Sequence, residues 1–277
     1  MREYTNKITL SKNSRGIYSL DPSMGCNSGT AESPMGCYSD CYAARYSKRY
    51  GYNFSKSILR HFENESHKHS IIRQIEKIDM PFIRMGTSGD PSENWEHTLG
   101  VCKSISTNYQ LNLFKQRRKE IVIITKHWSL LTDDQLEEIF NYNVCINTSV
   151  SALDNPDLLN KGLKEYERIK PFCKSILRVV SCDFNLSNEK GRKLAMIQDA
   201  MFKKYNALDT ILRVSKDNQY VLDGLINIKK TKFLGKKCYV SKYNKKTFFG
   251  KCKSCPEMCG LTIGVFRKRE RKRMTAA

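Results

Sequence analysis

The sequence lacks any apolar run that approaches the roughly 20 residues of a membrane-spanning helix, although 40% of its 277 residues are hydrophobic. Its first residues, MREYTNKITLSKNS, also lack the apolar core of a secretory signal. We therefore expect no membrane partner and a cytoplasmic location. A charged fraction of 27% beside that hydrophobic fraction is typical of a globular chain that can bury a core, and it excludes a disordered one.

Acidic residues are scarce, since 28 Asp and Glu stand against 48 Lys and Arg, a net charge of +20. The excess is concentrated in residues 201–277, which hold 20 basic and 5 acidic residues, a net charge of +15. Six of those basic residues fall in FRKRERKRM at 266–274, which is either a phosphate-binding tail or a solvated one. The charge therefore predicts a polyanion as partner, and nucleic acid, DNA or RNA, in particular.

The eleven cysteines are odd in number and no secretory signal accompanies them, so a disulfide framework is not expected. Seven of them fall in two tight groups, which suits thiolate-bound metal in a reduced cytoplasm. The other four are isolated in predicted helices and strands. We expect these four to be buried free thiols: Cys102, Cys145, Cys173 and Cys182.

Short apolar runs alternate with longer amphipathic ones along the middle of the chain. The runs predict strands at 17–20, 81–86, 120–126, 143–151, 175–182 and 209–215, and helices at 55–79, 92–105, 132–140, 155–170 and 188–205. About six strand–helix units indicate an α/β fold with a parallel sheet covered by helices. Periodicity leaves open a doubly wound sheet and an incomplete barrel. In either arrangement, ligands bind at the carboxyl ends of the strands.

The first cysteine group, Cys26, Cys37 and Cys41, has the spacing C-x10-C-x3-C in a loop rich in Gly, Ser and Asn. A closed structural zinc site usually has four protein ligands, whereas three thiolates leave one coordination position open. His61 could complete a zinc site, although it lies in a predicted helix twenty residues further on. A [4Fe–4S] cluster on three cysteines would keep one iron free for a ligand. Spacing alone leaves both metals open.

Two motifs resemble those of the radical S-adenosylmethionine superfamily, and most of all a phage-associated branch of it. The loop reads GC at 25–26, C at 37 and CYA at 41–43, which is similar to the GC…C…CYA loop of that branch. The segment TSGDP at 87–91 resembles the Gly-Gly-Glu-Pro motif that meets the methionine amino group. The resemblance covers roughly residues 15–215 and implies a bacterial or phage-infected host cell. It also implies a partial (β/α)6 barrel, in agreement with the six units counted above.

The resemblance implies a mechanism as well. The open iron of the cluster would hold S-adenosylmethionine, an electron donor would reduce the cluster, and cleavage of the sulfonium bond would give a 5′-deoxyadenosyl radical that abstracts hydrogen from the substrate. No residue is assigned as the catalytic group. Cofactor binding is assigned to residues near strand ends: Ser88, Gly89, Asp90, Lys126, Asn147, Ser149, Ser151, Arg178 and Arg213.

Each of these residues also has a structural interpretation. The segment 88–91 would serve equally as a turn and a helix N-cap, and Lys126 as a solvated strand end. The polar residues of 147–151 alternate along one face, which is also the pattern of a polar sheet edge. The two arginines could pair with core carboxylates, and we expect His127, a single histidine, to be structural.

The second cysteine group, C-x13-C-x2-C-x3-C, offers four ligands in a short loop-rich segment: Cys238, Cys252, Cys255 and Cys259. A closed zinc site and an auxiliary iron–sulfur cluster both suit it, and a structural metal would contribute roughly 10–16 kcal/mol of apparent binding energy to a segment with few apolar residues. Lysines and aromatic residues alternate around it, a composition suited to phosphate contact and base stacking. We therefore expect a barrel at 1–220, a small cysteine-rich metal-binding extension at 221–265, and a basic tail at 266–277.

Two hypotheses of different classes follow. The first is a radical S-adenosylmethionine enzyme that acts on nucleic acid, in modification or repair. The second is a non-catalytic, metal-stabilised nucleic-acid-binding protein. They differ in the first cysteine group, because catalysis needs an open metal position with a cavity that reaches it.

Overall fold

The computed structural model describes residues 3–27, 37–111 and 119–262, so the predicted basic tail, 266–277, lies outside the described residues. Its main element is a nine-stranded sheet with the order β1-β2-β5-β6-β7-β8-β10-β13-β12. Two smaller sheets pair β3 with β4 and β9 with β11. The strands are β1 (Leu10–Lys12), β2 (Tyr18–Leu20), β3 (Ser23–Met24), β4 (Ile58–Leu59), β5 (Phe82–Met85), β6 (Glu120–Thr125), β7 (Val144–Val150), β8 (Lys174–Ser181), β9 (Asp183–Phe184), β10 (Leu208–Val214), β11 (Ile226–Asn227), β12 (Lys229–Phe233) and β13 (Lys236–Ser241).

Six consecutive strands of the main sheet, β2-β5-β6-β7-β8-β10, are parallel and follow one another in chain order. A doubly wound sheet reverses its strand order at a switch point, and the described strands contain no such reversal. Antiparallel strands complete both edges, β1 on one side and β13 with β12 on the other. The predicted α/β fold with a large, mostly parallel sheet is therefore confirmed, and its strand order is not that of a doubly wound sheet.

Most helices begin at a side chain that caps the first turn. Thr132 accepts a hydrogen bond from the amide of Gln135, whose side chain accepts one from the amide of Thr132, so the capping box expected at this helix is present. Asparagine caps four others, at 64, 155, 188 and 218. The helices are α1 (Tyr42–Tyr50), α2 (Glu65–Glu76), α3 (Trp95–Leu111), α4 (Asp133–Phe140), α5 (Pro156–Arg168), α6 (Glu189–Lys204) and α7 (Gln219–Leu222), with short 3₁₀ turns at Cys37–Ser39, Pro91–Asn94, Cys252–Ser254 and Met258–Gly260.

Each of the six strands of the predicted units is present within two residues of its expected bounds. The helix expected over 55–79 is wrong in its first part, because residues 58–59 form β4 against β3 and the helix begins only after its cap at Asn64. The region 42–50, for which no helix was predicted, forms α1, which ends at Gly51 in the left-handed conformation. Its pattern of tyrosine every fourth residue could have indicated a helix.

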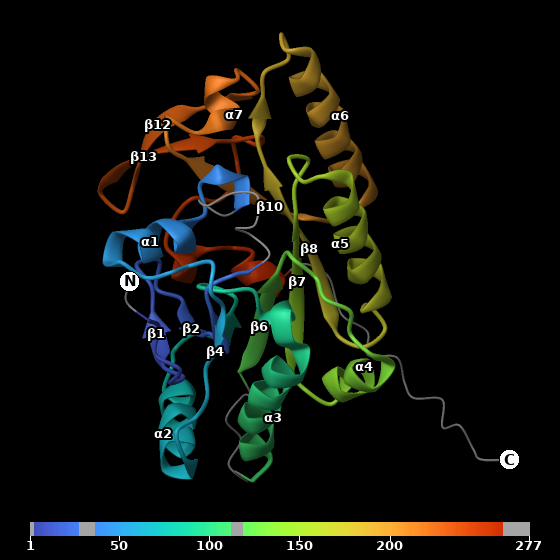
Figure 1. Cartoon of the computed structure of the whole chain (residues 1–277). Helices are drawn as coiled ribbons and strands as arrows, with labels where there is room; N and C mark the ends of the chain where they lie inside the picture. Colours follow the sequence, from blue (N-terminus) through green and yellow to red (C-terminus); the bar gives the residue numbers. More distant parts are fainter. Residues whose placement is uncertain (1–2, 28–36, 112–118, 263–277) are drawn as a thin grey trace, which may run out of the picture.

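Helices α5 and α6 and the C-terminal segment lie on opposite sides of the sheet. Figure 1 shows α5 and α6 along one side of β7, β8 and β10, while α1 and the red segment near residue 260 lie on the other. The C-terminal segment is in close contact with the sheet, because a β-carbon on Gly260 would lie 2.8 Å from the side chain of Ile176. Both cysteine-bearing regions therefore lie on the side of the sheet opposite to α5 and α6.

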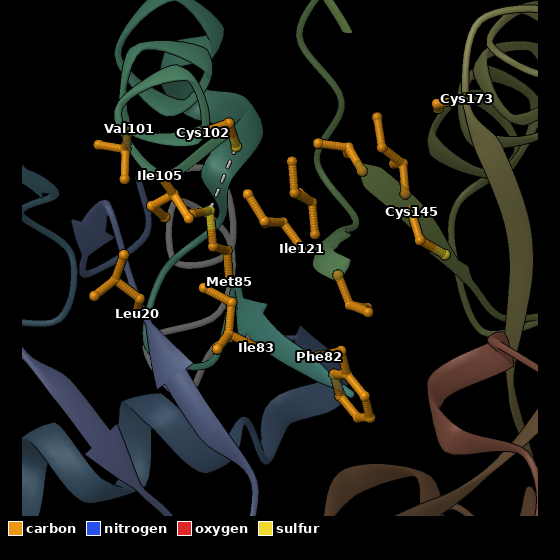
Figure 2. Close-up of a cluster of buried hydrophobic side chains, with 14 of the residues drawn as sticks. Leu20, Phe82, Ile83, Met85, Val101, Cys102, Ile105, Ile121, Cys145 and Cys173 are labelled. Carbon is orange, nitrogen blue, oxygen red and sulfur yellow. Dashed lines mark hydrogen bonds between the residues drawn. The ribbon is translucent and has the colours of Figure 1, made fainter. Parts of the chain in front are cut away.

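The core beneath the helices is apolar and includes the isolated cysteines. Figure 2 shows Met85 and Ile121 of the sheet packed against α3, where the thiol of Cys102 donates to the sulfur of Met85 at 3.9 Å. All four isolated cysteines are buried, with 3% or less of their surface exposed, so that expectation is confirmed. Burial raises the pKa of Cys102 and of Cys173 to about 12, so both thiols are protonated in the core.

The predicted extension 221–265 is joined to the main sheet in its described part. Strands β12 and β13 form a hairpin around Leu234 and Gly235, both with positive φ, and β13 pairs antiparallel with β10. The sequence signal for this hairpin is weak, because Leu-Gly is not a preferred hairpin turn and the run KKTKF is rich in lysine, which is depleted in strands. No described helix combines the length and the apolar character that crossing a membrane requires.

Candidate functional site

A cavity of about 290 Å³ lies at the carboxyl ends of the parallel strands. The three cysteines of the first group, Cys26, Cys37 and Cys41, all line it. This is the end of a parallel sheet at which ligands of α/β proteins bind. Five of the nine residues predicted for cofactor binding line the same cavity: Gly89, Asp90, Lys126, Ser149 and Arg213.

A second cavity of about 260 Å³ adjoins the first, since Tyr42 and Arg213 line both. Two acidic residues, Asp209 and Glu257, lie on its wall. Because cationic side chains outnumber the acidic ones, this cavity suits an anionic ligand. Four arginines and three cysteines of the second group line it: Arg15, Arg84, Arg178, Arg213, Cys252, Cys255 and Cys259.

Backbone contacts hold the first cysteine against the loop that follows β5. The amide of Gly25 donates to the carbonyl of Ser88 at 3.0 Å, and Gly25 pairs with Gly89 in an isolated bridge. A β-carbon on Gly89 would lie 2.8 Å from the carbonyl oxygen of Gly25, so the chains can approach this closely only with glycine at 89. Cys26 is buried beside this bridge, at 6% exposure. Ser88 therefore serves the site through its backbone, and its side chain lines neither cavity described above.

The carboxylate of Asp90 is engaged on both oxygens. One oxygen accepts hydrogen bonds from the amide and hydroxyl of Ser92, at 3.1 and 2.9 Å, and from the hydroxyl of Thr125 at 2.6 Å. The other accepts from the amides of Lys126 and His127, both at 2.8 Å. Asp90 thus ties the loop after β5 to the end of β6, and the predicted N-cap is present. With five donors on a buried carboxylate, little capacity remains for a ligand.

The side chain of Lys126 reaches the loop of the first cysteine group. Its ammonium nitrogen lies 2.5 Å from a carboxylate oxygen of Asp154 and 2.5 Å from the hydroxyl of Tyr38. The same nitrogen lies 4.6 Å from the centre of the Tyr38 ring. The side chains of the ion pair are 12% and 2% exposed, so the alternative of a solvated strand end is wrong. Lys126 fixes the residue that directly follows Cys37.

Two further contacts secure the same loop from β10 and the residues after it. The carboxylate of Asp40 accepts a hydrogen bond from the amide of Ser215 and pairs with Arg45 at 2.8 Å. The side-chain amide of Asn218 donates to the carbonyl of Tyr38 at 2.8 Å. Tyr38 itself has a φ of +59°, which non-glycine residues rarely adopt and which these contacts stabilise. Residues from three strand ends therefore position the segment 37–41.

The thiol of Cys37 lies 3.2 Å from Nε2 of His127. Burial raises the pKa of this thiol to about 12, against the opposing charge of Lys126, and burial also lowers the pKa of His127. The site therefore holds a neutral thiol beside a neutral imidazole. Within the ranges that the structure describes, no three His, Cys, Asp or Glu side chains lie close enough to hold a metal ion as they stand. The chemical type of the ligands nevertheless suits iron or zinc, because three thiols, which are soft ligands, line one cavity.

The remaining predicted residues lie deeper. Asn147 is completely buried, and its carbonyl oxygen has no hydrogen-bond partner among the described residues. Ser151 is buried too, with its hydroxyl donating to the carbonyl of Val180 at 2.8 Å, so it serves the sheet. Arg178 lines the second cavity and forms no ion pair within the described ranges, although Glu257 lies near enough to interact electrostatically. Core pairing therefore does not explain Arg178.

The second cysteine group is brought together only in part. Cys252, Cys255 and Cys259 share the wall of the second cavity, and their charges interact with one another. Cys238 lies on β13, where its neighbour is Arg213, and it does not line either cavity described above. The predicted four-thiol site is therefore not assembled as it stands among the described residues.

Sequence reasoning missed several residues of the site. Tyr38 and Asp154 fall in loops, where nothing in the pattern distinguishes them from ordinary turn residues. Arg15 and Arg84 could have been found, because an arginine within or just before an apolar strand is unusual. No protein-family model, curated protein or solved structure matches this chain. The site is therefore interpreted from its own residues.

Proposed function

We propose that this chain is a radical S-adenosylmethionine enzyme with a partial (β/α)6 barrel, acting on nucleic acid in its modification or repair. One observation carries the proposal. Three thiols from the connection between β3 and α1 line one cavity, at the carboxyl ends of parallel strands that follow one another in chain order. An adjoining arginine-lined cavity gives room for an anionic substrate beside it.

Cys26, Cys37 and Cys41 would hold a [4Fe–4S] cluster. Bound there with S-adenosylmethionine, the cluster would supply a hydrogen-abstracting 5′-deoxyadenosyl radical. The thiols must lose their protons on metal binding, and the high pKa of Cys37 makes its release of a proton dependent on the metal. Cys41 directly precedes α1, and the partial positive charge of that helix end suits an anionic group bound beside it.

The chain offers a small set of groups for the methionine end of S-adenosylmethionine. The Asp90 carboxylate is occupied, so its contribution is to fix the loop that shapes the cavity. Ser149 and Arg213 line the cavity and can donate hydrogen bonds. Burial and nearby arginines lower the pKa of Arg213, which indicates that its charge is poorly compensated and suits a carboxylate. We assign the methionine carboxylate to these two residues.

The charge supports nucleic acid as the substrate. Five lysines of the hairpin are exposed: Lys229, Lys230, Lys232, Lys236 and Lys237. A cytoplasmic electron donor is required as a second partner. The second cysteine group would hold a second metal, zinc or an auxiliary iron–sulfur cluster, on Cys252, Cys255 and Cys259 with Cys238 moving to join them.

The experiment is anaerobic reconstitution with iron and sulfide, followed by reduction and chromatographic measurement of 5′-deoxyadenosine. We expect wild-type protein to form it from S-adenosylmethionine and Cys37→Ala to form none. Cys102→Ala, which alters a buried thiol far from the cavity, is the matched control and should keep the activity. A wild-type protein that carries an intact cluster by electron paramagnetic resonance, yet forms no product, contradicts the proposal.

A second candidate function rests on one contact. His127 lies 3.2 Å from the Cys37 thiol, so its imidazole is placed to act as a fourth metal ligand. A closed site would make the chain a non-catalytic, metal-stabilised nucleic-acid-binding protein. His127→Ala distinguishes the two, because it should leave the iron content of an open site unchanged and reduce the metal content of a closed one. Metal analysis of the wild-type protein and of His127→Ala decides between the two functions.

A further inference from the structure

The exposed face of α1 carries three tyrosines that the fold does not use. Tyr42, Tyr46 and Tyr50 are 51%, 48% and 44% exposed, and their spacing of four residues places them in one row. Their ring centres lie 6.4 and 4.6 Å apart along the row. The opposite face of the helix, with Ala43, Ala44 and Ser47, makes the buried contacts. Rings of this size are rarely left in water without a binding role.

The row is embedded in positive charge. The helix sequence YAARYSKRY contains three cations and no acidic residue. Arg45 pairs with Asp40, whereas neither Lys48 nor Arg49 forms an ion pair within the described part of the chain. The guanidinium of Arg49 lies 5.9 Å from the centre of the Tyr50 ring. Arg45 and Arg49 flank the tyrosine row on the exposed surface of α1, and Lys48 lies further around the helix. Aromatic and cationic groups placed side by side suit bases and phosphates together.

The row leads to both the cavities and the lysine-rich hairpin. Tyr42 lines the two cavities, and the guanidinium of Arg213 lies 6.0 Å from the Tyr42 ring. On its other side Arg213 lies 5.5 Å from the ring of Phe233, at the end of β12. Phe233 in turn lies 4.5 Å from Phe249, centre to centre. Aromatic and guanidinium groups thus form a continuous rim from α1 to the hairpin, and Figure 1 shows both elements on the side away from α6.

We propose that this rim is a binding track for single-stranded nucleic acid, with bases stacked on Tyr42, Tyr46 and Tyr50 and phosphates on Lys48, Arg49 and the hairpin lysines. Unpaired bases expose the ring faces that the tyrosines need, whereas a duplex hides them. The track would bring one nucleotide to the mouth of the cavities at Tyr42. This inference rests on the proposed function for its substrate class, but binding requires no turnover and is measured separately.

The test is fluorescence anisotropy with a labelled 15-nucleotide DNA strand of mixed sequence, the same strand as RNA, and the DNA as a duplex, each at several salt concentrations. We expect the single strands to bind more tightly than the duplex. Tyr46→Ala with Tyr50→Ala should weaken binding by about tenfold or more without changing the salt slope, because stacking releases no counterions. Tyr46→Phe with Tyr50→Phe should bind as wild type.

A complementary pair of variants tests the phosphate contacts. Lys48→Gln with Arg49→Gln should reduce the salt slope by about 1.4, at roughly 0.7 for each contact to a single strand. Met196→Ala, on the exposed surface of α6, is the control and should change neither the affinity nor the salt slope. Tighter binding of the DNA or of the RNA strand shows which sugar the protein prefers, and either preference supports the track.

Three results would overturn the proposal. The alanine variants could bind as wild type, the duplex could bind as tightly as the single strands, or the alanine variants could change the oligomeric mass in light scattering. The last result would assign the tyrosine row to contact with a protein. Formation of 5′-deoxyadenosine without loss of binding in these variants would reject the track and leave the proposed chemistry intact. Nucleic-acid binding that the alanine variants weaken, in a protein that forms no 5′-deoxyadenosine, would support the track and reject the proposed chemistry.

Discussion

The two cysteine regions of this protein are held in place by different means. In the first region, which comprises Cys26 and residues 37–41, the side chains of Lys126 and His127 after β6 and the backbone amide of Ser215 after β10 bind the loop directly. In the second region, residues 252–262, most contacts are short turns within the segment, with a few anchors to the rest of the chain. The amide of Cys252 donates to the carbonyl of Arg15, and the ammonium of Lys174 donates to the carbonyl of Leu261. Lys253 forms an exposed ion pair with Asp79.

This difference indicates which of the two regions depends on a metal for its folding. The first region has a geometry that the sheet imposes, so the protein can present its thiols before a metal arrives. The second region packs against the sheet but has few hydrogen bonds to the rest of the chain, so bound metal would contribute more to its order. We therefore expect chelation to loosen residues 252–262 and to leave residues 37–41 in place. Hydrogen exchange with and without chelator measures both in one experiment.

The largest expected effect comes from breaking the anchor of the first region. Lys126→Met removes the ion pair with Asp154 and the contact with the Tyr38 hydroxyl, and it leaves a carboxylate buried without its partner. We expect a loss of about 3–5 kcal/mol in the free energy of unfolding. Urea denaturation measures it, and analysis for both iron and zinc should show loss of the first metal with retention of the second.

The matched control for this change is Lys170→Met, which breaks an exposed ion pair with Glu167. It should cost less than about 1 kcal/mol. Equal costs for the two lysines would mean that the Lys126 network does not position the cysteine loop.

A smaller effect is expected from Asp90→Asn. An amide in place of the carboxylate keeps one acceptor oxygen, so the amides of Lys126 and His127 or the donors on the other oxygen lose their partner. We expect a cost of about 2–3 kcal/mol, since buried donors are left unsatisfied. Thermal unfolding followed by circular dichroism is the measurement. Asp217→Asn, at an exposed aspartate, should be neutral, and a neutral Asp90→Asn would show that the carboxylate is free for a ligand.

The second region is tested by Gly260→Ala. Gly260 has a φ of +89°, and an added β-carbon would lie 2.8 Å from Ile176. We expect a cost of roughly 1–2 kcal/mol, confined to the packing of this region against the sheet. Limited proteolysis should cut the variant near residue 250 faster than wild type, while residues 37–41 stay protected. Gly100→Ala, where an added β-carbon meets no atom within 4 Å, is the control.

The smallest expected effect is a pH dependence that belongs to neither region. Burial lowers the pKa of His97, whose ring packs against His61 and bonds the carbonyl of Arg60 at 2.8 Å. The unfolded chain therefore binds a proton more readily, and stability falls as the pH drops through the ordinary histidine pKa of about 6.5. Melting temperatures between pH 7.5 and 5.5 should show this fall, and His97→Gln should reduce its slope, leaving the part that His127 contributes. A slope unchanged in the variant would assign the pH dependence to other groups.

Local patterns in the sequence predicted the six strands of the parallel sheet well. Runs such as EIVIITK, and the capping box at Thr132, specify their structure within a few residues. The contacts that shape the site depend on distant residues instead. Lys126 meets Tyr38 across 88 positions and Asn218 meets Tyr38 across 180, and no periodicity reports such pairs. Asp90 resembled a ligand residue in sequence, yet its five donors are revealed only by the fold.

The open sheet has one further consequence. A sheet that does not close on itself leaves two outer strands whose backbone groups could template pairing with other copies of the chain. Here one border is β1, only three residues long, and the other is β12, which carries Lys229, Lys230 and Lys232. Mutual repulsion of these ammonium groups opposes edge-to-edge polymerisation. Neutralising them should therefore make the protein prone to aggregate, whatever it does to ligand affinity.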